Sequence, residues 1–175
     1  ARHPHGVREL IHGGTWNNLP GQPTDDSEMA LMLARMLVRV GAYDPTEARR
    51  AYVHWYRSGP FDVGGTTSMA LGGGSPSQTS QANGSLMRIS PLGIFAAGHP
   101  ERAAAWARQD SSISHPHPAC LDACAAYTSA LAVAIGDGVH ALDCYQAALD
   151  EASRPGTSES VRQALEAART EPPAD

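Results

Sequence analysis

The stretch "PGQPTDDSEMALMLARML" (residues 20–37) sets a threonine and two carboxylates directly before an apolar run. The apolar side chains recur at spacings of three and four residues: Met29, Leu33, Met36, Leu37 and Val40. This period is that of an amphipathic helix, and Gly41 is a suitable residue to end it. We therefore expect a helix over residues 25–40 that starts with two acids where the core begins.

Two interpretations explain the adjacent acids. In the first, Thr24 or Asp25 caps the helix and Glu28 completes a capping box. One acid would suffice for this role, and the helix dipole offsets the repulsion between two acids by only ~0.3–1 kcal/mol each. In the second, a hard cation such as Mg²⁺, which prefers oxygen ligands, neutralises the pair. The stretch alone leaves both interpretations open.

The rest of the chain is predicted to be helical and to form a single all-α domain over residues 1–175. Period and capping residues predict helices over 45–57, 85–97, 101–111, 119–135, 139–152 and 158–168. The helix over 85–97 is expected to start late or to kink at Pro91. Residues 62–80 are rich in glycine and serine and are expected to form a flexible loop. No segment shows the alternation of a strand.

Composition narrows the classes of function. Of the 175 residues, 42% are hydrophobic, which is enough for a core, and the net charge of −5 argues against nucleic acid as a partner. No basic run suggests a membrane surface, and no stretch reaches the ~18 consecutive apolar residues of a membrane span. Cys120, Cys124 and Cys144 are an odd number without a CxxC pair, so we expect free thiols and a cytoplasmic protein.

Two further stretches carry candidate binding residues. In "QANGSLMRIS" (81–90), Asn83 and Gly84 precede a predicted helix, where backbone N–H groups suit a diphosphate or carboxylate, or simply form a capped turn. In "DSSISHPHPAC" (110–120), His115 and His117 lie between helices. A zinc site would want more ligands nearby, and the cysteines that follow are better explained as helix-face residues.

Together these stretches resemble the ADP-ribosylglycohydrolase family. Its motif T-D-D-[TS]-x-[MQ] is matched by "TDDSEM" at 24–29, and N-G-[AS]-x-M-R by "NGSLMR" at 83–88. An acid–x–x–x–[ST]-H segment before a proline and an alanine-rich helix is matched by "DSSISHPHP" at 110–118. The three motifs occur in the family's order, and the resemblance covers about residues 6–150.

The resemblance implies a compact all-α fold around a cleft that holds two Mg²⁺ or Mn²⁺ ions. Such enzymes cleave the bond between the anomeric carbon of ADP-ribose and a modified side chain or small leaving group. Carried over residue by residue, the metal ligands would be Thr24, Asp25 and Asp26, of which Asp25 and Asp26 would also be catalytic. The substrate-binding residues would be Asn83, Gly84, Ser85 and His115, and Gly72–Gly74 would lie near the phosphates.

The resemblance also implies what this stretch of sequence lacks. The family opens with a helix that carries a further acid, and it closes its metal site with a later D-x-D-[ST] motif. We therefore expect the family fold to be incomplete at both ends, and a fragment of a longer enzyme is favoured over a partner-completed or inactive protein. The expected partner is an ADP-ribosylated protein or an ADP-ribose-containing small molecule, with the acceptor group left open.

Two other classes of function stay open beside the enzyme. One is a non-catalytic ADP-ribose-binding module, and the other is a structural member of the family, like those found as lens proteins. The intact Thr24-Asp25-Asp26 triplet argues against both, because neither function needs a metal site.

Overall fold

Helices make up almost all of the regular structure. A computed structural model describes residues 9–137 and 139–170, and within these ranges there is no strand, only a single antiparallel bridge between Gly13 and Asn18. The elements are α1 (Asp25–Val40), α2 (Pro45–Arg57), α3 (Gly65–Leu71), η1 (Leu86–Arg88), α4 (Ser90–Phe95), α5 (Pro100–Ser112), α6 (Pro118–Asp137), α7 (Ala141–Ala152) and α8 (Glu159–Ala167). The all-α prediction is confirmed.

Local sequence signals set the ends of the first two helices. The extended backbone of Thr24 precedes α1, and Gly41 ends it with φ of 77°, in the left-handed region that glycine adopts without strain. Asp44 caps α2, because its carboxylate accepts hydrogen bonds from the N–H groups of Thr46 and Glu47 at 2.8 and 2.9 Å. Pro45 then occupies the first turn, where its missing N–H costs nothing.

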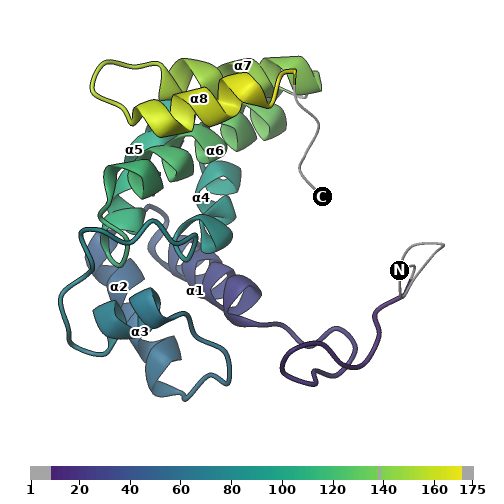
Figure 1. Cartoon of the computed structure of the whole chain (residues 1–175), viewed down its shortest axis with the longest axis vertical. Helices are drawn as coiled ribbons and strands as arrows, with labels where there is room; N and C mark the ends of the chain where they lie inside the picture. The colour runs from purple at the N-terminus through teal and green to yellow at the C-terminus, as the bar shows by residue number, and fades with distance from the viewer. Residues whose placement is uncertain (1–8, 138, 171–175) are drawn as a thin grey trace.

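The helices form two groups that meet at α4 and η1. In Figure 1, α1, α2 and α3 lie together at one end, and α5, α6, α7 and α8 stack at the other. Helix α6 packs against α4, α5, α7 and α8, and α1 packs against α2, α4 and η1. Helix α6 is therefore the centre of the larger group, whereas in the smaller group α2 packs against both α1 and α3.

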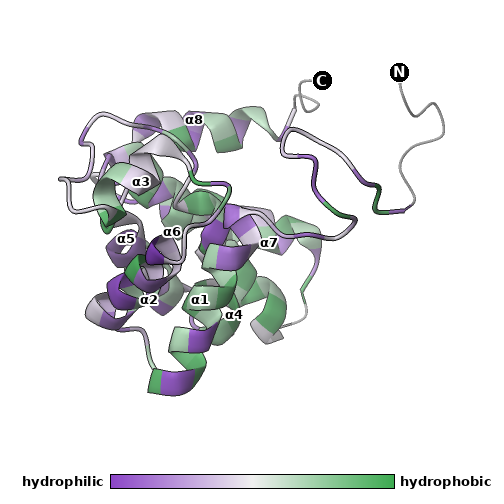
Figure 2. Ribbon diagram, turned by 90° about the horizontal axis from the view of Figure 1, so that it is seen from below, coloured by the Kyte–Doolittle hydropathy of each residue, from purple (hydrophilic) through white to green (hydrophobic). Residues whose placement is uncertain are grey.

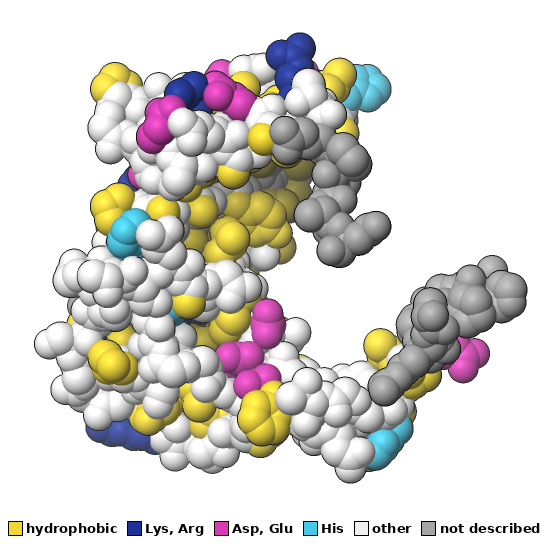
Figure 3. Space-filling model, in the orientation of Figure 1, with side chains coloured by type: hydrophobic (Ala, Val, Ile, Leu, Met, Phe, Trp, Pro, Cys, Tyr) yellow, Lys and Arg dark blue, Asp and Glu magenta, His cyan; other side chains and the backbone are white. Residues whose placement is uncertain are grey.

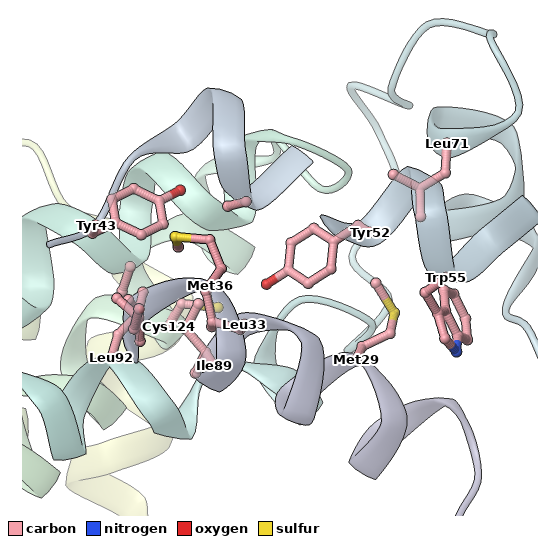
Figure 4. Packing of buried hydrophobic residues seen from close by; sticks show 13 residues of the cluster. Met29, Leu33, Met36, Tyr43, Tyr52, Trp55, Leu71, Ile89, Leu92 and Cys124 are labelled. Carbon is pink, nitrogen blue, oxygen red and sulfur yellow. The ribbon is translucent and has the colours of Figure 1, made fainter. Parts of the chain in front are cut away.

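The main core lies between α1, α2 and the segment that follows α3. Met29, Leu33 and Met36 of α1 are at most 1% exposed, and they face Tyr52 of α2 and Ile89 before α4 (Figure 4). In Figure 2 the ribbon of α4 and much of α1 is green, whereas α2 and α5 carry more purple. The apolar face predicted for α1 is thus the one that builds the core.

Helix α6 is long and apolar enough to cross a membrane by length and mean hydropathy, contrary to the expectation from the sequence. Its alanines raise the mean hydropathy although Asp122, Thr128 and Ser129 interrupt the apolar run. The packing of four other helices on α6 explains this composition, since small side chains let helices approach closely. At Gly136, an added Cβ would lie 2.3 Å from the backbone nitrogen of Gly98.

Two sequence predictions need correction. Residues 62–80 are not entirely a loop, because α3 forms within them and buries Thr67, Ala70 and Leu71. The glycines that flank this helix concealed its short apolar face. Residues 85–97 do not form one helix: η1 is followed by α4, which begins at Ser90 with Pro91 in its first turn. The predicted late start is correct, but the single helix is wrong.

Candidate active site

The acidic start of α1 does not form the predicted capping box. The side chain of Thr24 makes no capping hydrogen bond; its hydroxyl donates to Asp26 Oδ2 at 3.2 Å. The carboxylate of Glu28 accepts instead from Trp55 Nε1 at 2.7 Å, which ties α1 to α2. Asp25 is 8% exposed and accepts the N–H of Asp26 at 3.1 Å, while the side chain of Asp26 is exposed. The acids are therefore not accounted for by capping.

A third acid, Asp62, joins the pair from the loop between α2 and α3. Burial raises the pKa of Asp25, the charge of Asp62 raises it further, and Asp26 adds to both, while the N–H of Gly64 opposes them. Figure 3 shows acidic side chains gathered where α1 begins. Sequence reasoning missed Asp62 because it lies in a stretch interpreted as a flexible loop. The only local signal was an acid two residues before the glycine pair Gly64-Gly65.

The donor chemistry at this point suits a hard cation. Carboxylates and a threonine hydroxyl offer oxygen ligands, and a divalent ion would relieve the repulsion that raises the pKa of Asp25. Within residues 9–137 and 139–170, however, no group of three or more His, Cys, Asp or Glu side chains is arranged to hold a metal ion. The metal assignment therefore stays a prediction.

A cleft of about 800 Å³ opens beside the acidic cluster. Asp26, Asn83 and Ser85 line it on one side. The opposite wall is mostly apolar and comes from α6 and α8, including Ala123, Tyr127, Val161 and Leu165. The structure therefore brings together three of the predicted site residues, from segments far apart in the sequence, at the polar edge of an apolar groove.

Gly84 and His115 lie behind this cleft rather than in its lining. An added Cβ at Gly84 would lie 2.7 Å from His115 Cε1 and 2.9 Å from Thr67 Oγ1, so only glycine fits without displacing a neighbour. The side chain of His115 is fully buried, and in the described part of the chain its Nε2 has no hydrogen-bond partner. His115 thus supports the 83–85 segment from within the protein.

The histidine at 117 and the glycines at 72 and 74 make structural contacts and do not line the cleft. His117 Nδ1 accepts the N–H of Ala119 at 3.2 Å and so shapes the start of α6. Gly72 and Gly74 pack against the backbone of Ser68 and Met69 at the end of α3 and do not line the cleft. No zinc-like cluster surrounds the histidines in the residues that the structure describes.

A buried ion pair contacts the 83–85 segment, because Arg88 Nη1 donates to the carbonyl of Gly84 at 3.4 Å. Arg88 is fully buried and donates from Nε to Asp110 Oδ2 at 3.2 Å, with its guanidinium 4.3 Å from the centre of the Tyr52 ring. The hydroxyl of Tyr52 donates to both carboxylate oxygens of Asp110, at 3.0 and 3.1 Å. Burial raises the pKa of Asp110, and the charge of Arg88 and the tyrosine hydroxyls oppose this shift.

Burial also controls the charge of the other titratable groups near the site. Burial and then the charge of Arg88 lower the pKa of His115 to about 4, so its imidazole is neutral at pH 7. Burial raises the pKa of Cys124 to about 11. The three cysteines are free, as predicted, and the thiol of Cys124 stays protonated, which makes it a poor nucleophile.

Comparison with known proteins identifies the family of this chain. A model of the ADP-ribosylglycohydrolase family matches residues 1–175, and the chain belongs to this family. It is 33% identical over 129 residues to ADP-ribosyl-[dinitrogen reductase] glycohydrolase of Rhodospirillum rubrum, a match that covers 69% of this chain and 44% of that protein. It is 31% identical over 146 residues to ADP-ribosylarginine hydrolase Tri1 of Pseudomonas putida (strain GB-1), a match that covers 74% of this chain and 39% of that protein. The chain thus spans less than half the length of these relatives.

Proposed function

We propose that this chain is part of a metal-dependent hydrolase that cleaves the glycosidic bond between ADP-ribose and an acceptor group, and so reverses ADP-ribosylation. The observation that carries the proposal is the convergence of Asp26, Asn83 and Ser85 at one cleft, beside the crowded carboxylates of Asp25 and Asp62. Family membership supports the same reaction.

The proposed substrate is an ADP-ribosylated protein. One relative is named for ADP-ribosylated dinitrogen reductase and another for ADP-ribosylarginine. ADP-ribosylarginine is therefore the first acceptor to test, and an ADP-ribose-containing small molecule is the second. The three free thiols support a reducing, cytoplasmic compartment for this reaction.

The chemistry follows from the residues at the polar edge of the cleft. Cleavage at an anomeric carbon passes through an oxocarbenium-like transition state, in which a carboxylate accepts the proton of the attacking water. Asp26 is exposed to the cleft, and the Thr24 hydroxyl orients its carboxylate. Thr24, Asp25 and Asp26 would hold Mg²⁺ or Mn²⁺, which when bound lowers the pKa of a ligated water. Asn83 offers an amide to the polar atoms of the substrate.

The test is hydrolysis by the full-length protein that carries this chain. We expect Asp25→Ala and Asp26→Ala each to lower the rate of ADP-ribose release by about 100-fold or more, the size expected for loss of a catalytic acid or base. Circular dichroism should show unchanged helix content. The matched control is Asp150→Asn, which removes an exposed charge on α7 that does not line the cleft. Retained turnover in both alanine variants would contradict the assignment.

One observation favours a second candidate, a non-catalytic ADP-ribose-binding module. The described residues hold no complete cluster of metal ligands, which a binding module would not need. Isothermal titration of ADP-ribose with and without Mg²⁺ separates the candidates. Binding that needs Mg²⁺ supports the hydrolase, binding that ignores it supports the module, and no binding supports a structural member of the family.

A further inference from the structure

The hydroxyl of Ser114 connects the buried guanidinium of Arg88 to the imidazole of His115 by two hydrogen bonds. Arg88 Nη1 lies 2.9 Å from Ser114 Oγ, and Ser114 Oγ lies 2.9 Å from His115 Nδ1. All three side chains are fully buried, so solvent does not compete for these contacts. The other nitrogens of Arg88 are held by Asp110, whose carboxylate is in turn held by Tyr52. The position of the guanidinium is therefore fixed on both sides.

The direction of each hydrogen bond follows from the chemistry of the donors. Arginine has no acceptor, so Nη1 donates to Ser114 Oγ. The hydroxyl of Ser114 can then donate its own proton, and the acceptor within reach is His115 Nδ1. If Nδ1 carried the hydrogen instead, the Ser114 hydroxyl could not donate its proton to this nitrogen, because both groups would be donors. The arrangement therefore leaves Nδ1 as an acceptor, and the hydrogen of the neutral imidazole resides on Nε2.

The Nε2 atom faces the segment that lines the cleft. An added Cβ at Gly84 would lie 3.0 Å from Nε2 and 2.9 Å from Thr67 Oγ1, so both polar atoms lie against the same glycine. Nε2 is buried and has no partner among the described residues. An N–H donor left without an acceptor in a buried position is costly, and such groups occur where a ligand or water completes them.

We propose that Arg88 and Ser114 are positioning residues that hold His115 as the Nε2–H tautomer, so that a hydrogen-bond donor, and no acceptor, stands behind Gly84. The imidazole held in this way packs against Gly84 and fixes the position of the 83–85 segment, whose Asn83 and Ser85 line the cleft where a phosphate or ribose oxygen would bind. The identity of that ligand rests on the proposed function, whereas the tautomer does not.

The experiment is nitrogen NMR of the full-length protein labelled with ¹⁵N at histidine, recorded at neutral pH without ligand. The two imidazole nitrogens have distinct shifts according to which carries the hydrogen, and a His115→Gln variant identifies the signals of His115. We expect Nε2 to be protonated in the wild type. In Ser114→Ala the preference should be lost, and Ser114→Thr, which keeps the hydroxyl, should restore it.

Binding of ADP-ribose is measured on the same variants by titration. We expect at least a fivefold weaker affinity in Ser114→Ala and recovery in Ser114→Thr. The control is Ser112→Ala, because Ser112 is an exposed serine two residues earlier, at the end of α5, whose hydroxyl donates to the Gln109 carbonyl. Thermal unfolding of each variant separates a loss of affinity from a loss of fold.

Each outcome has a defined meaning. A wild-type spectrum with hydrogen on Nδ1 overturns the proposal, and so does an unchanged Nε2–H tautomer in Ser114→Ala. Because the wild-type spectrum decides the first step, a variant that folds poorly does not prevent the test. A changed tautomer with unchanged affinity overturns the role in binding. If the wild type does not bind ADP-ribose at all, the proposed function fails, while the tautomer result stands separately.

Discussion

At the scale of single residues, His115 should make the folded protein sensitive to acid. Burial and Arg88 lower its pKa from 6.5 to about 4, so the unfolded chain binds a proton at a higher pH than the folded chain does. The stability that depends on the neutral imidazole is complete above pH 6.5 and is lost as the pH falls toward 4. The loss over this window should be about 3 kcal/mol, since one pKa unit corresponds to about 1.36 kcal/mol.

Urea unfolding between pH 7 and 4 checks this expectation. The difference in unfolding free energy between the wild type and His115→Gln should change with pH, because the glutamine does not titrate. The difference isolates His115 from other groups that titrate in acid, such as Asp25 and Asp110. Parallel pH profiles of the two proteins would show that the imidazole is not buried as described.

Gly84 is the second residue with a direct test. In Gly84→Ala the new Cβ would lie within 3 Å of His115 Cε1 and Thr67 Oγ1, neither of which is the end of a long side chain. We expect a loss of about 1–3 kcal/mol in unfolding free energy, as for overpacked cores, together with weaker ADP-ribose binding. Gly65→Ala is the matched control, since an added Cβ there meets nothing within 4 Å. Equal effects at the two positions would contradict the close approach.

At the scale of elements, the Arg88–Asp110 pair joins η1 to α5, and Tyr52 adds α2. Removing one partner leaves a buried charge without compensation, which costs about 3–5 kcal/mol. We expect this loss in Arg88→Met and in Asp110→Ala, and a double variant whose loss is smaller than the sum of the two.

A double-mutant cycle in urea measures the coupling between these elements. Arg39→Ala is the control, because Arg39 contacts Glu47 at 2.6 Å on the surface, where an ion pair contributes about 1 kcal/mol or less. Additive losses at Arg88 and Asp110 would mean that the pair does not join η1 to α5 as the structure indicates.

At the scale of the whole molecule, the 175-residue chain by itself should respond weakly to metal. The described residues hold no complete ligand cluster, and the chain spans less than half the length of its curated relatives. An ion that binds only the folded state stabilises it by RT ln(1 + [L]/Kd), so at a concentration near Kd the gain is only about 0.4 kcal/mol. We expect almost no shift in Tm at about millimolar Mg²⁺.

The comparison is between melting curves of this chain and of a polypeptide extended through any downstream D-x-D-[ST] motif. The longer protein should gain several degrees in Tm with Mg²⁺ and release ADP-ribose from substrate. A large Mg²⁺-dependent rise in the Tm of the 175-residue chain, together with hydrolysis, would contradict this expectation. It would show that Thr24, Asp25 and Asp26 form a working metal site with other residues of this chain.

Much of the fold was predictable because helix signals are local. The three-to-four spacing in 25–40, the glycine at 41 and the Asp44-Pro45 pair determine where α1 and α2 begin and end, and the structure confirms them. The short helix α3 and the break between η1 and α4 were missed, because neither is long enough to show a helical period.

The candidate site, like the fold, was predictable from the sequence only in part. Sequence by itself determined which residues are chemically suited to the site, since Thr24, Asp25, Asp26, Asn83 and Gly84 stand in short motifs with their own chemistry. Only the tertiary structure decided their neighbours: it brought Asp62 to Asp25, put His115 behind Gly84, and placed Arg88 within reach of Ser114. The physical reason is that distances and burial depend on how the helices pack, and the sequence motifs do not contain this packing.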